Sequence, residues 1–141
     1  MTDEWLAGFF DGEGCISGAM VFIATKYIKN PRVHLQITIT QKDRGILEKI
    51  QEKYGGSIRQ HTKGSKCWSI RWIGKTEMKN ILCILAPYCI CKKEQVLLAL
   101  RFVDTLREEN LGSKPLPANI HNERKEIFDG LRLCKYGHTV T

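Results

Sequence analysis

The sequence predicts an α+β domain in which helices cover one face of a four-stranded antiparallel sheet. Segments in which apolar and polar residues alternate occur in two pairs, as expected for two β-hairpins. Segments with apolar residues at helical spacing precede and follow each pair. The predicted order is helix, two strands, helix, two strands and three helices. No linker separates the two αββ units, so residues 1–141 are expected to form a single domain.

In the first unit, residues 3–12 are expected to form a short helix that ends around Gly12 and Gly14. Residues 15–24 are strand-like, and a basic turn follows at residues 26–31. Residues 32–40 give the clearest strand, because period-2 alternation places four apolar side chains on one face. Those four residues are Val33, Leu35, Ile37 and Ile39.

In the second unit, a helix is expected over residues 42–53, with Gly55-Gly56 as its stop. Strands follow at residues 57–63 and 67–72, the second with Trp68, Ile70 and Trp72 on its buried side. Thr76 is the expected N-cap of a helix that ends at Leu85, before Pro87. Two more helices are expected at residues 92–107 and 119–133, joined by a loop that includes residues 112–117.

The charge balance favours a polyanionic partner. Lys and Arg number 22 against 15 Asp and Glu, so the formal net charge is +7. Such a chain suits nucleic acid or a membrane surface. No apolar run reaches spanning length, and the acidic N-terminus does not resemble a signal peptide. We therefore expect no membrane partner and an intracellular protein, in cytoplasm, nucleoid or organelle.

The six cysteines lack paired C-x-x-C spacing and lie in apolar-patterned segments. Reduced thiols are the favoured interpretation. Disulfides remain an alternative if the source is a hyperthermophile, and a zinc site is a weaker one.

One face of the predicted sheet is polar, basic and free of carboxylates. An ordinary solvated sheet face mixes acidic and basic residues, whereas Arg and Gln on a sheet face suit the edges of guanine and adenine in the major groove. This face predicts nucleic-acid binding. It comprises Ser17, Arg32, His34, Gln36, Thr38, Arg59, His61, Lys63, Ser69 and Arg71.

The first helix is unusual for a plain amphipathic helix. Each interior glycine costs about 1 kcal/mol relative to alanine, yet Gly8 and Gly12 lie four residues apart, with Ala7 beside Gly8. Small residues at this spacing create a flat surface for a second helix. Asp11 and Glu13 follow at the C-terminal end, where the helix dipole disfavours negative charge and a divalent cation would relieve the conflict. The alternative is an acidic turn that ends a helix.

The segment from Leu6 to Gly14 resembles the LAGLIDADG motif of homing endonucleases, in the form L-A-G-F-x-D-G-(D/E)-G. The order of elements over roughly residues 3–109 is similar to that family's αββαββα core, so the resemblance implies a saddle-shaped sheet with additional C-terminal helices. The chain has one such motif, which implies a homodimer whose motif helices pack together. Ala7, Gly8, Asp11 and Gly12 would lie in that interface.

The resemblance also implies a set of catalytic residues. Glu13 would be the essential metal ligand, Gly12 would offer its carbonyl to the metal, and Asp11 would have a more structural role. Mg²⁺, or Mn²⁺, would be the cofactor. Thr40-Gln41-Lys42 resembles the family's T-Q-K, in which the glutamine positions the attacking water.

A further basic residue is implied by the segment Leu85-Ala86-Pro87-Tyr88, which resembles the family's L-x-P-(F/Y) segment. The family has a basic residue five places after this proline, and here that position is Lys92. Lys93 is the neighbouring alternative, and Arg44 is a further candidate for the same pocket.

The implied function is site-specific hydrolysis of double-stranded DNA at a long pseudo-palindromic target, associated with an intron or intein. Lys26, Lys29 and Lys63 at the hairpin tips would grip flanking phosphates. Two non-cutting alternatives are an RNA maturase with an intron RNA partner and a LAGLIDADG-derived DNA-binding protein.

Overall fold

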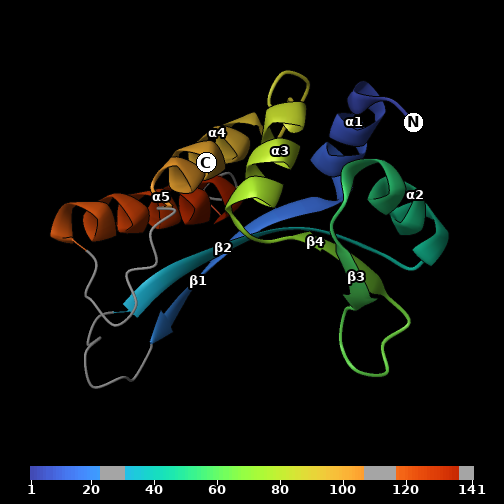
Figure 1. The fold of residues 1–141 in the computed structure, drawn as a ribbon, viewed down its shortest axis with the longest axis horizontal. Coiled ribbons are helices and arrows are strands. Elements are labelled where there is room, and N and C mark those ends of the chain that lie inside the picture. The colour runs from blue at the N-terminus through green and yellow to red at the C-terminus, as the bar shows by residue number, and fades with distance from the viewer. Residues whose placement is uncertain (23–30, 107–116, 137–141) are drawn as a thin grey trace.

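The computed structural model describes residues 1–22, 31–106 and 117–136. Within these ranges, five helices lie on one side of a four-stranded antiparallel sheet, and the opposite side of the sheet is left uncovered (Figure 1). No helix in the described ranges combines the length and apolarity needed to cross a membrane.

The predicted order of elements is confirmed. The first unit contains α1 (Asp3–Glu13), β1 (Gly14–Phe22) and β2 (Pro31–Gln41), and the second contains α2 (Arg44–Tyr54), β3 (Ser57–Gln60) and β4 (Trp68–Trp72). Helices α3 (Lys75–Leu85), α4 (Lys93–Asp104) and α5 (Ala118–Tyr136) complete the described chain. The strands are arranged in the order β1-β2-β4-β3, so the long hairpin and the short one meet at β2 and β4.

The core lies between the sheet and the helices. Val33, Leu35, Ile37 and Ile39 on β2 are each at most 5% exposed, which confirms the alternation predicted for this strand. Helices α1, α3 and α4 pack buried side chains against the same core, among them Phe10, Leu85 and Phe102. The polar faces of the strands therefore point to the uncovered side.

The second hairpin differs from its prediction. Strand β3 ends at Gln60 instead of residue 63. The His61 amide still donates to the Cys67 carbonyl at 2.9 Å, one step beyond the Gln60–Trp68 pair, and the chain turns over the following residues. Gly64 has φ +80°, a conformation that favours glycine. His61 and Lys63 thus lie in the loop between β3 and β4.

Two helix starts also differ. The prediction that Thr76 caps α3 is wrong, because the helix begins at Lys75 and the cap position is Gly74, with φ +97°. Helix α2 begins at Arg44 because the Asp43 carboxylate accepts the amide of Gly45 at 2.9 Å and so caps the helix. Most of the expected basic turn at 26–31 and of the loop at 112–117 lies outside the described residues.

Candidate active site

Helix α1 has one buried face and one open face. Leu6, Ala7 and Phe10 are completely buried in the core. Gly8 and Gly12 lie on the other side, where an added Cβ would meet no heavy atom within 4 Å. The packing of this chain therefore does not require glycine at either position. The expectation that Ala7 faces a partner helix is wrong, because its side chain is fully enclosed by its own chain.

The open face of α1 also carries aromatic side chains. Trp5 is 41% exposed and stacks on Phe9 with ring centroids 5.0 Å apart. Trp5, Gly8, Phe9 and Gly12 follow i, i+3, i+4 and i+7 spacing, so they share one stripe of the helix. We call these four residues the α1 stripe.

Glu13 is the last residue of α1 and is followed directly by β1. The Gly14 amide donates to the Phe10 carbonyl and closes the helix. A Cβ at Gly14 would collide with the Phe10 ring, so this close approach requires glycine. The junction contains no loop, and it leaves the exposed Glu13 side chain beside the end of β2.

The structure brings Glu13 and Gln41 together. Gln41 Nε2 donates a hydrogen bond to Glu13 Oε2 at 3.0 Å, although the two residues are 28 positions apart. A carboxylate that accepts from a side-chain amide keeps its remaining lone pairs for other ligands. This pair is the centre of the candidate site.

Lys92 lies at the same end of α1. Its ammonium donates to the Asp11 carbonyl at 2.5 Å, and its side chain is half-buried. Lys93 is the exposed first residue of α4. The contact with α1 therefore favours Lys92 over Lys93 as the lysine of the site.

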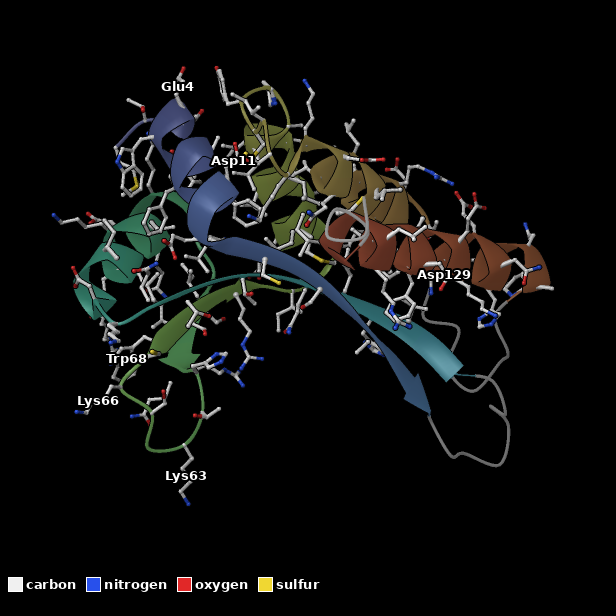
Figure 2. All side chains as sticks on the ribbon, turned by 180° about the vertical axis from the view of Figure 1, so that it is seen from behind. Glu4, Asp11, Lys63, Lys66, Trp68 and Asp129 are labelled. Atoms are coloured by element: carbon white, nitrogen blue, oxygen red, sulfur yellow. The ribbon has the colours of Figure 1, made fainter. Side chains whose placement is uncertain are left out.

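Asp11 turns its carboxylate to its own chain (Figure 2). Its two oxygens accept the amides of Ile90 at 2.7 Å and Lys92 at 3.0 Å. Burial opposes ionisation, but amide donors from Ile90, Lys92 and Cys91 outweigh it and hold the pKa of Asp11 below its ordinary value. The carboxylate is thus engaged inside the chain, which agrees with the more structural role expected of Asp11, while its place in a helix-helix interface stays a prediction.

Cys89 is a buried residue close to Asp11, and its thiol is unreactive. Its thiol donates to the Ala7 carbonyl at 3.7 Å. Burial, with a further contribution from the Asp11 charge, raises the pKa of Cys89 to about 12. A thiol that stays protonated is a poor nucleophile.

The donors at the end of α1 suit a hard divalent cation. Within one chain they are the Glu13 carboxylate and the Gly12 carbonyl, which lies in the last turn, where carbonyls lack intrahelical donors. Oxygen donors of this kind are preferred by Mg²⁺, which keeps several waters and binds through one or two carboxylates. Among the described residues of one chain, no three His, Cys, Asp or Glu side chains gather around a common point. A second copy of α1 would supply the second carboxylate.

The uncovered side of the sheet collects most of the predicted DNA-contacting residues. The register places Ser17 opposite Gln36, and Thr38 lies between Cys15 and Arg71. His34 and Arg59 are exposed, whereas Ser17, Gln36, Thr38 and Arg71 are half-buried. Arg32 pairs with Val21 through the backbone, and its side chain is outside the description, as are Lys26 and Lys29.

Ser69 does not contribute an accessible hydroxyl to this surface. It is only 3% exposed, and it contacts Thr40 Oγ1 at 2.8 Å and His61 Nδ1 at 3.1 Å. The prediction that Ser69 contacts DNA is therefore wrong. Its hydroxyl links β2 to the loop after β3. Strand alternation places Thr40 on the same face, although it was not among the predicted DNA contacts, and the register sets it opposite Ser69.

Arg44 lies beside the strand end that carries Gln41. Its guanidinium carbon is 4.3 Å from the centre of the Trp68 ring, and Trp68 pairs with Gln41 across the sheet. Arg44 Nε also contacts Glu48 at 3.0 Å. These contacts hold Arg44 near the candidate site.

The positive charge belongs to the strands and connecting segments. Helices α1–α5 contain 11 Lys and Arg against 12 Asp and Glu, whereas the rest of the chain contains 11 against 3. Lys63 and Lys66 extend from the loop between β3 and β4, away from the helices (Figure 2). Among the described residues, β3, β4 and the loop between them carry Arg59, Lys63, Lys66 and Arg71 and no acidic residue.

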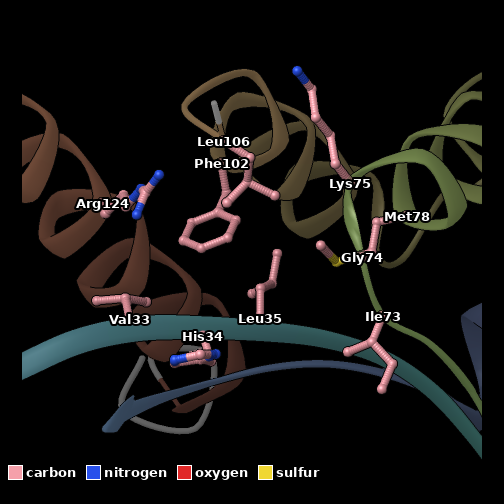
Figure 3. A pocket seen from close by; sticks show the side chains of 10 residues that line it. All are labelled: Val33, His34, Leu35, Ile73, Gly74, Lys75, Met78, Phe102, Leu106 and Arg124. Carbon is pink, nitrogen blue, oxygen red and sulfur yellow. The ribbon is translucent and has the colours of Figure 1, made fainter. Parts of the chain in front are cut away.

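A cavity of about 380 Å³ lies between β2, the start of α3 and the helices α4 and α5 (Figure 3). Its walls include Leu35, Met78 and Phe102, with Arg124 at one side. Glu13, Gln41 and Lys92 do not line it. This cavity is separate from the candidate site.

Helix α1 thus carries glycines on its open face and ends in a carboxylate beside a four-stranded antiparallel sheet. The family model described as LAGLIDADG endonuclease matches residues 6–101, and the chain belongs to this family. It is 31% identical over 151 aligned positions to the DNA endonuclease I-CvuI of Chlorella vulgaris, covering 96% of this chain and 92% of that protein. It is also 37% identical over 59 residues to the intron-encoded RNA maturase bI4 of Saccharomyces cerevisiae, covering 40% of this chain and 8% of the maturase.

Solved structures show the same fold. The I-CvuI homing endonuclease in complex with target DNA superimposes with a TM-score of 0.79 at 27% identity, over 94% of this chain and 80% of that one. The archaeal intron-encoded homing endonuclease I-Vdi141I, complexed with DNA, gives a TM-score of 0.67 at 22% identity, over 93% of this chain and 96% of that one. The predicted α+β architecture and the resemblance are confirmed.

Proposed function

We propose that this protein is a homing endonuclease that cuts both strands of a long, pseudo-palindromic DNA site as a homodimer, in association with an intron or intein. The observation that carries the proposal is the hydrogen bond from Gln41 to Glu13 at the open end of α1. It joins a carboxylate able to bind metal to a polar group able to orient water. The relatives support the substrate, since I-CvuI was crystallised with its DNA target.

The α1 stripe supports the proposed dimer. Gly8 and Gly12 leave open space beside the helix, and Trp5 and Phe9 present apolar surface next to it. A two-fold contact uses the same patch on both subunits, so two α1 stripes would face each other. Two Glu13 carboxylates would then lie at neighbouring helix ends, and each would keep its own Gln41.

The residues of one chain divide the work of phosphodiester hydrolysis. Gln41 is placed to orient the water that attacks the phosphorus, and the Lys92 ammonium supplies positive charge near the phosphate. Glu13 and the Gly12 carbonyl would hold Mg²⁺ or Mn²⁺, which supplies Lewis acidity and lowers the pKa of bound water. Structures of I-CvuI determined with Mg and with Ca support a divalent cation.

DNA would lie along the uncovered side of the sheet. Arg59, Arg71 and Gln36 are suited to base edges in the major groove. Lys63 on the loop after β3, with Lys26 and Lys29, would contact flanking phosphates and make binding depend on salt. In the dimer the two sheets would form one saddle over adjacent major-groove segments.

A second candidate function is RNA maturation. The match to the maturase bI4 favours it, and the same basic surface suits an intron RNA. A maturase would bind its intron RNA and promote splicing whether or not Glu13 is intact. The carboxylate of Glu13 therefore separates the two functions.

The test is to incubate the protein with a library of randomised DNA duplexes, with Mg²⁺ and with EDTA. We expect cuts at one family of long sites that require Mg²⁺ and disappear in Glu13→Gln. Glu52→Gln, which changes an exposed carboxylate on α2, is the matched control and should cut normally. Wild-type protein that binds duplexes tightly and cuts none would refute the endonuclease and leave a DNA-binding protein. Splicing of an intron RNA that persists in Glu13→Gln would identify a maturase.

A further inference from the structure

We propose that Asp11 is a positioning residue for the cleavage reaction, because it clamps Lys92 against the end of α1 next to Gly12 and Glu13. The catalytic part of this inference rests on the proposed function. The clamp itself is a property of the folded chain.

The start of α4 lacks a cap from its own segment. Lys92 occupies the N-cap position, and no side chain there accepts a helix amide. The first amides of a helix have no intrahelical acceptor and favour a nearby anion. Asp11 brings such an anion from α1, about 80 positions earlier, and accepts the amide of the N-cap residue Lys92 at 3.0 Å and the amide of Ile90, two residues before the cap, at 2.7 Å. The carboxylate therefore fixes the backbone on which Lys92 stands.

The Lys92 side chain also contacts Asp11. Its ammonium donates to the Asp11 carbonyl at 2.5 Å, so Lys92 donates to Asp11 twice, once from its backbone amide and once from its side chain. A lysine side chain carries about 2 kcal/mol of rotamer entropy. Here its backbone and its ammonium are both held. The residue after that carbonyl is Gly12, and the next is Glu13.

The clamp needs two acceptors. Asp11 uses one oxygen for Ile90 and the other for Lys92. An asparagine keeps one acceptor and turns an NH₂ donor toward the second amide, so one amide loses its partner. Asp11→Asn therefore loosens the segment that carries Lys92 while changing the volume of the side chain very little.

The first experiment reads the clamp without DNA or metal. Lysines are acetylated with a limiting amount of acetic anhydride, and Lys92 is compared with its exposed neighbour Lys93 by mass spectrometry. We expect the ratio of Lys92 to Lys93 labelling to rise several-fold in Asp11→Asn. Asp43→Asn is the matched control, because Asp43 caps α2 and does not touch Lys92. An unchanged ratio in Asp11→Asn, or an equal rise in Asp43→Asn, overturns the proposal.

The second experiment asks whether Asp11 acts through Lys92. Cleavage of a bound target is measured for Asp11→Asn, Lys92→Met and the double variant. We expect Asp11→Asn to lower kcat by up to about 10²-fold, as small misplacements of catalytic groups do, while KM changes little. Its effect should largely vanish in the Lys92→Met background. Independent effects in the two backgrounds would show a merely structural role and overturn the proposal. If the wild-type protein cuts no DNA, the proposed function fails, and the labelling ratio alone decides whether Asp11 holds Lys92.

Discussion

Helices α1 and α2 occupy the same place in the two αββ units, yet only α2 has the outer face of a helix that stays in solvent. Both have 11 residues, and both bury apolar side chains, Phe10 on α1 and Ile50 on α2. The outer face of α2 is charged, with an ion pair from Arg44 to Glu48 at 3.0 Å. The open face of α1 instead carries the glycines and aromatic rings of the α1 stripe.

The two helices also end differently. Helix α2 ends at Gly55, with φ +75°, and the chain then enters a short hairpin. Helix α1 passes directly into β1, so Glu13 is fixed against the sheet. A charged face of the α2 type is typical of a helix that stays in solvent. The open face of α1 lacks such charges, and in the proposed function its end would hold the metal ligand. The two units share a topology, but only the first would then supply the acidic residue of the reaction.

A larger side chain in the α1 stripe should have the largest effect on the protein. Gly8→Leu should produce a monomer that does not cut DNA, because the new side chain blocks the approach of a second helix. The monomer itself should be at least as stable as before, since leucine favours a helix over glycine by up to about 1 kcal/mol and the Cβ meets no neighbour. Light scattering and a cutting assay measure both effects.

Lys49→Leu makes the corresponding change on α2 and serves as its control. It should leave the dimer and the cutting rate unchanged, because Lys49 is exposed on the solvated face. A Gly8→Leu protein that remains dimeric at the same concentration would contradict the pairing of α1 stripes.

The buried faces of α1 and α2 should make similar contributions to the free energy of unfolding, although their outer faces differ. Phe10→Ala should lower the free energy of unfolding by about 3–5 kcal/mol and Ile50→Ala by about 2–5 kcal/mol, since both side chains are fully buried. Denaturant unfolding at one fixed protein concentration measures this, because dimerisation makes stability depend on concentration. A loss well below 1 kcal/mol at either position would show that the two units do not share one core.

Much of this arrangement was predictable from local patterns. Alternation along β2 identified its four buried residues because successive side chains of a strand point to opposite faces. The motif that contains Glu13 and the strand end that carries Gln41 were identified separately. The fold brings Gln41 Nε2 to 3.0 Å from Glu13 Oε2. The buried residues of β2, Glu13 and Gln41 could therefore each be predicted from the sequence of their own segment.

Other features depend on tertiary structure and were not predictable in the same way. Ala7 is next to Gly8 in the chain, but about 100° of helical rotation turns it into the core. Ser69 looked accessible until the register set it against Thr40 and the loop brought in His61. The bonds between Asp11 and Lys92 join segments about 80 positions apart, and no local pattern reports them.

The second unit should contribute to DNA binding through its strands and not through its helix. Arg71→Ala should weaken binding of the target by about 1–3 kcal/mol, because Arg71 lies on the uncovered side of the sheet. Lys49→Ala removes a positive charge from the outer face of α2 and should change the affinity much less. Titrations in Ca²⁺ at several salt concentrations compare the two variants. Equal losses of affinity in the two variants would mean that DNA contacts the helical side as well. The uncovered face of the sheet would then not be the principal DNA-binding surface.

The smallest expected effect is at the contact that joins the two helices. The Tyr54 hydroxyl on α2 donates to Asp3 Oδ1 on α1 at 2.7 Å. Burial, with help from Asp3, raises the pKa of Tyr54 to about 12. A pKa raised above the unfolded value of about 10 means that the stabilisation is complete below pH 10 and is lost as pH rises toward 12. Tyr54→Phe should therefore cost about 1 kcal/mol at neutral pH, and the difference from wild type should shrink between pH 10 and 12. Tyr88→Phe removes a hydroxyl that bonds to Glu4 from a side chain that is 43% exposed, and as the comparison variant it should lower the free energy of unfolding much less. If Tyr54→Phe left the free energy of unfolding unchanged, this hydrogen bond between the two helices would not contribute to stability.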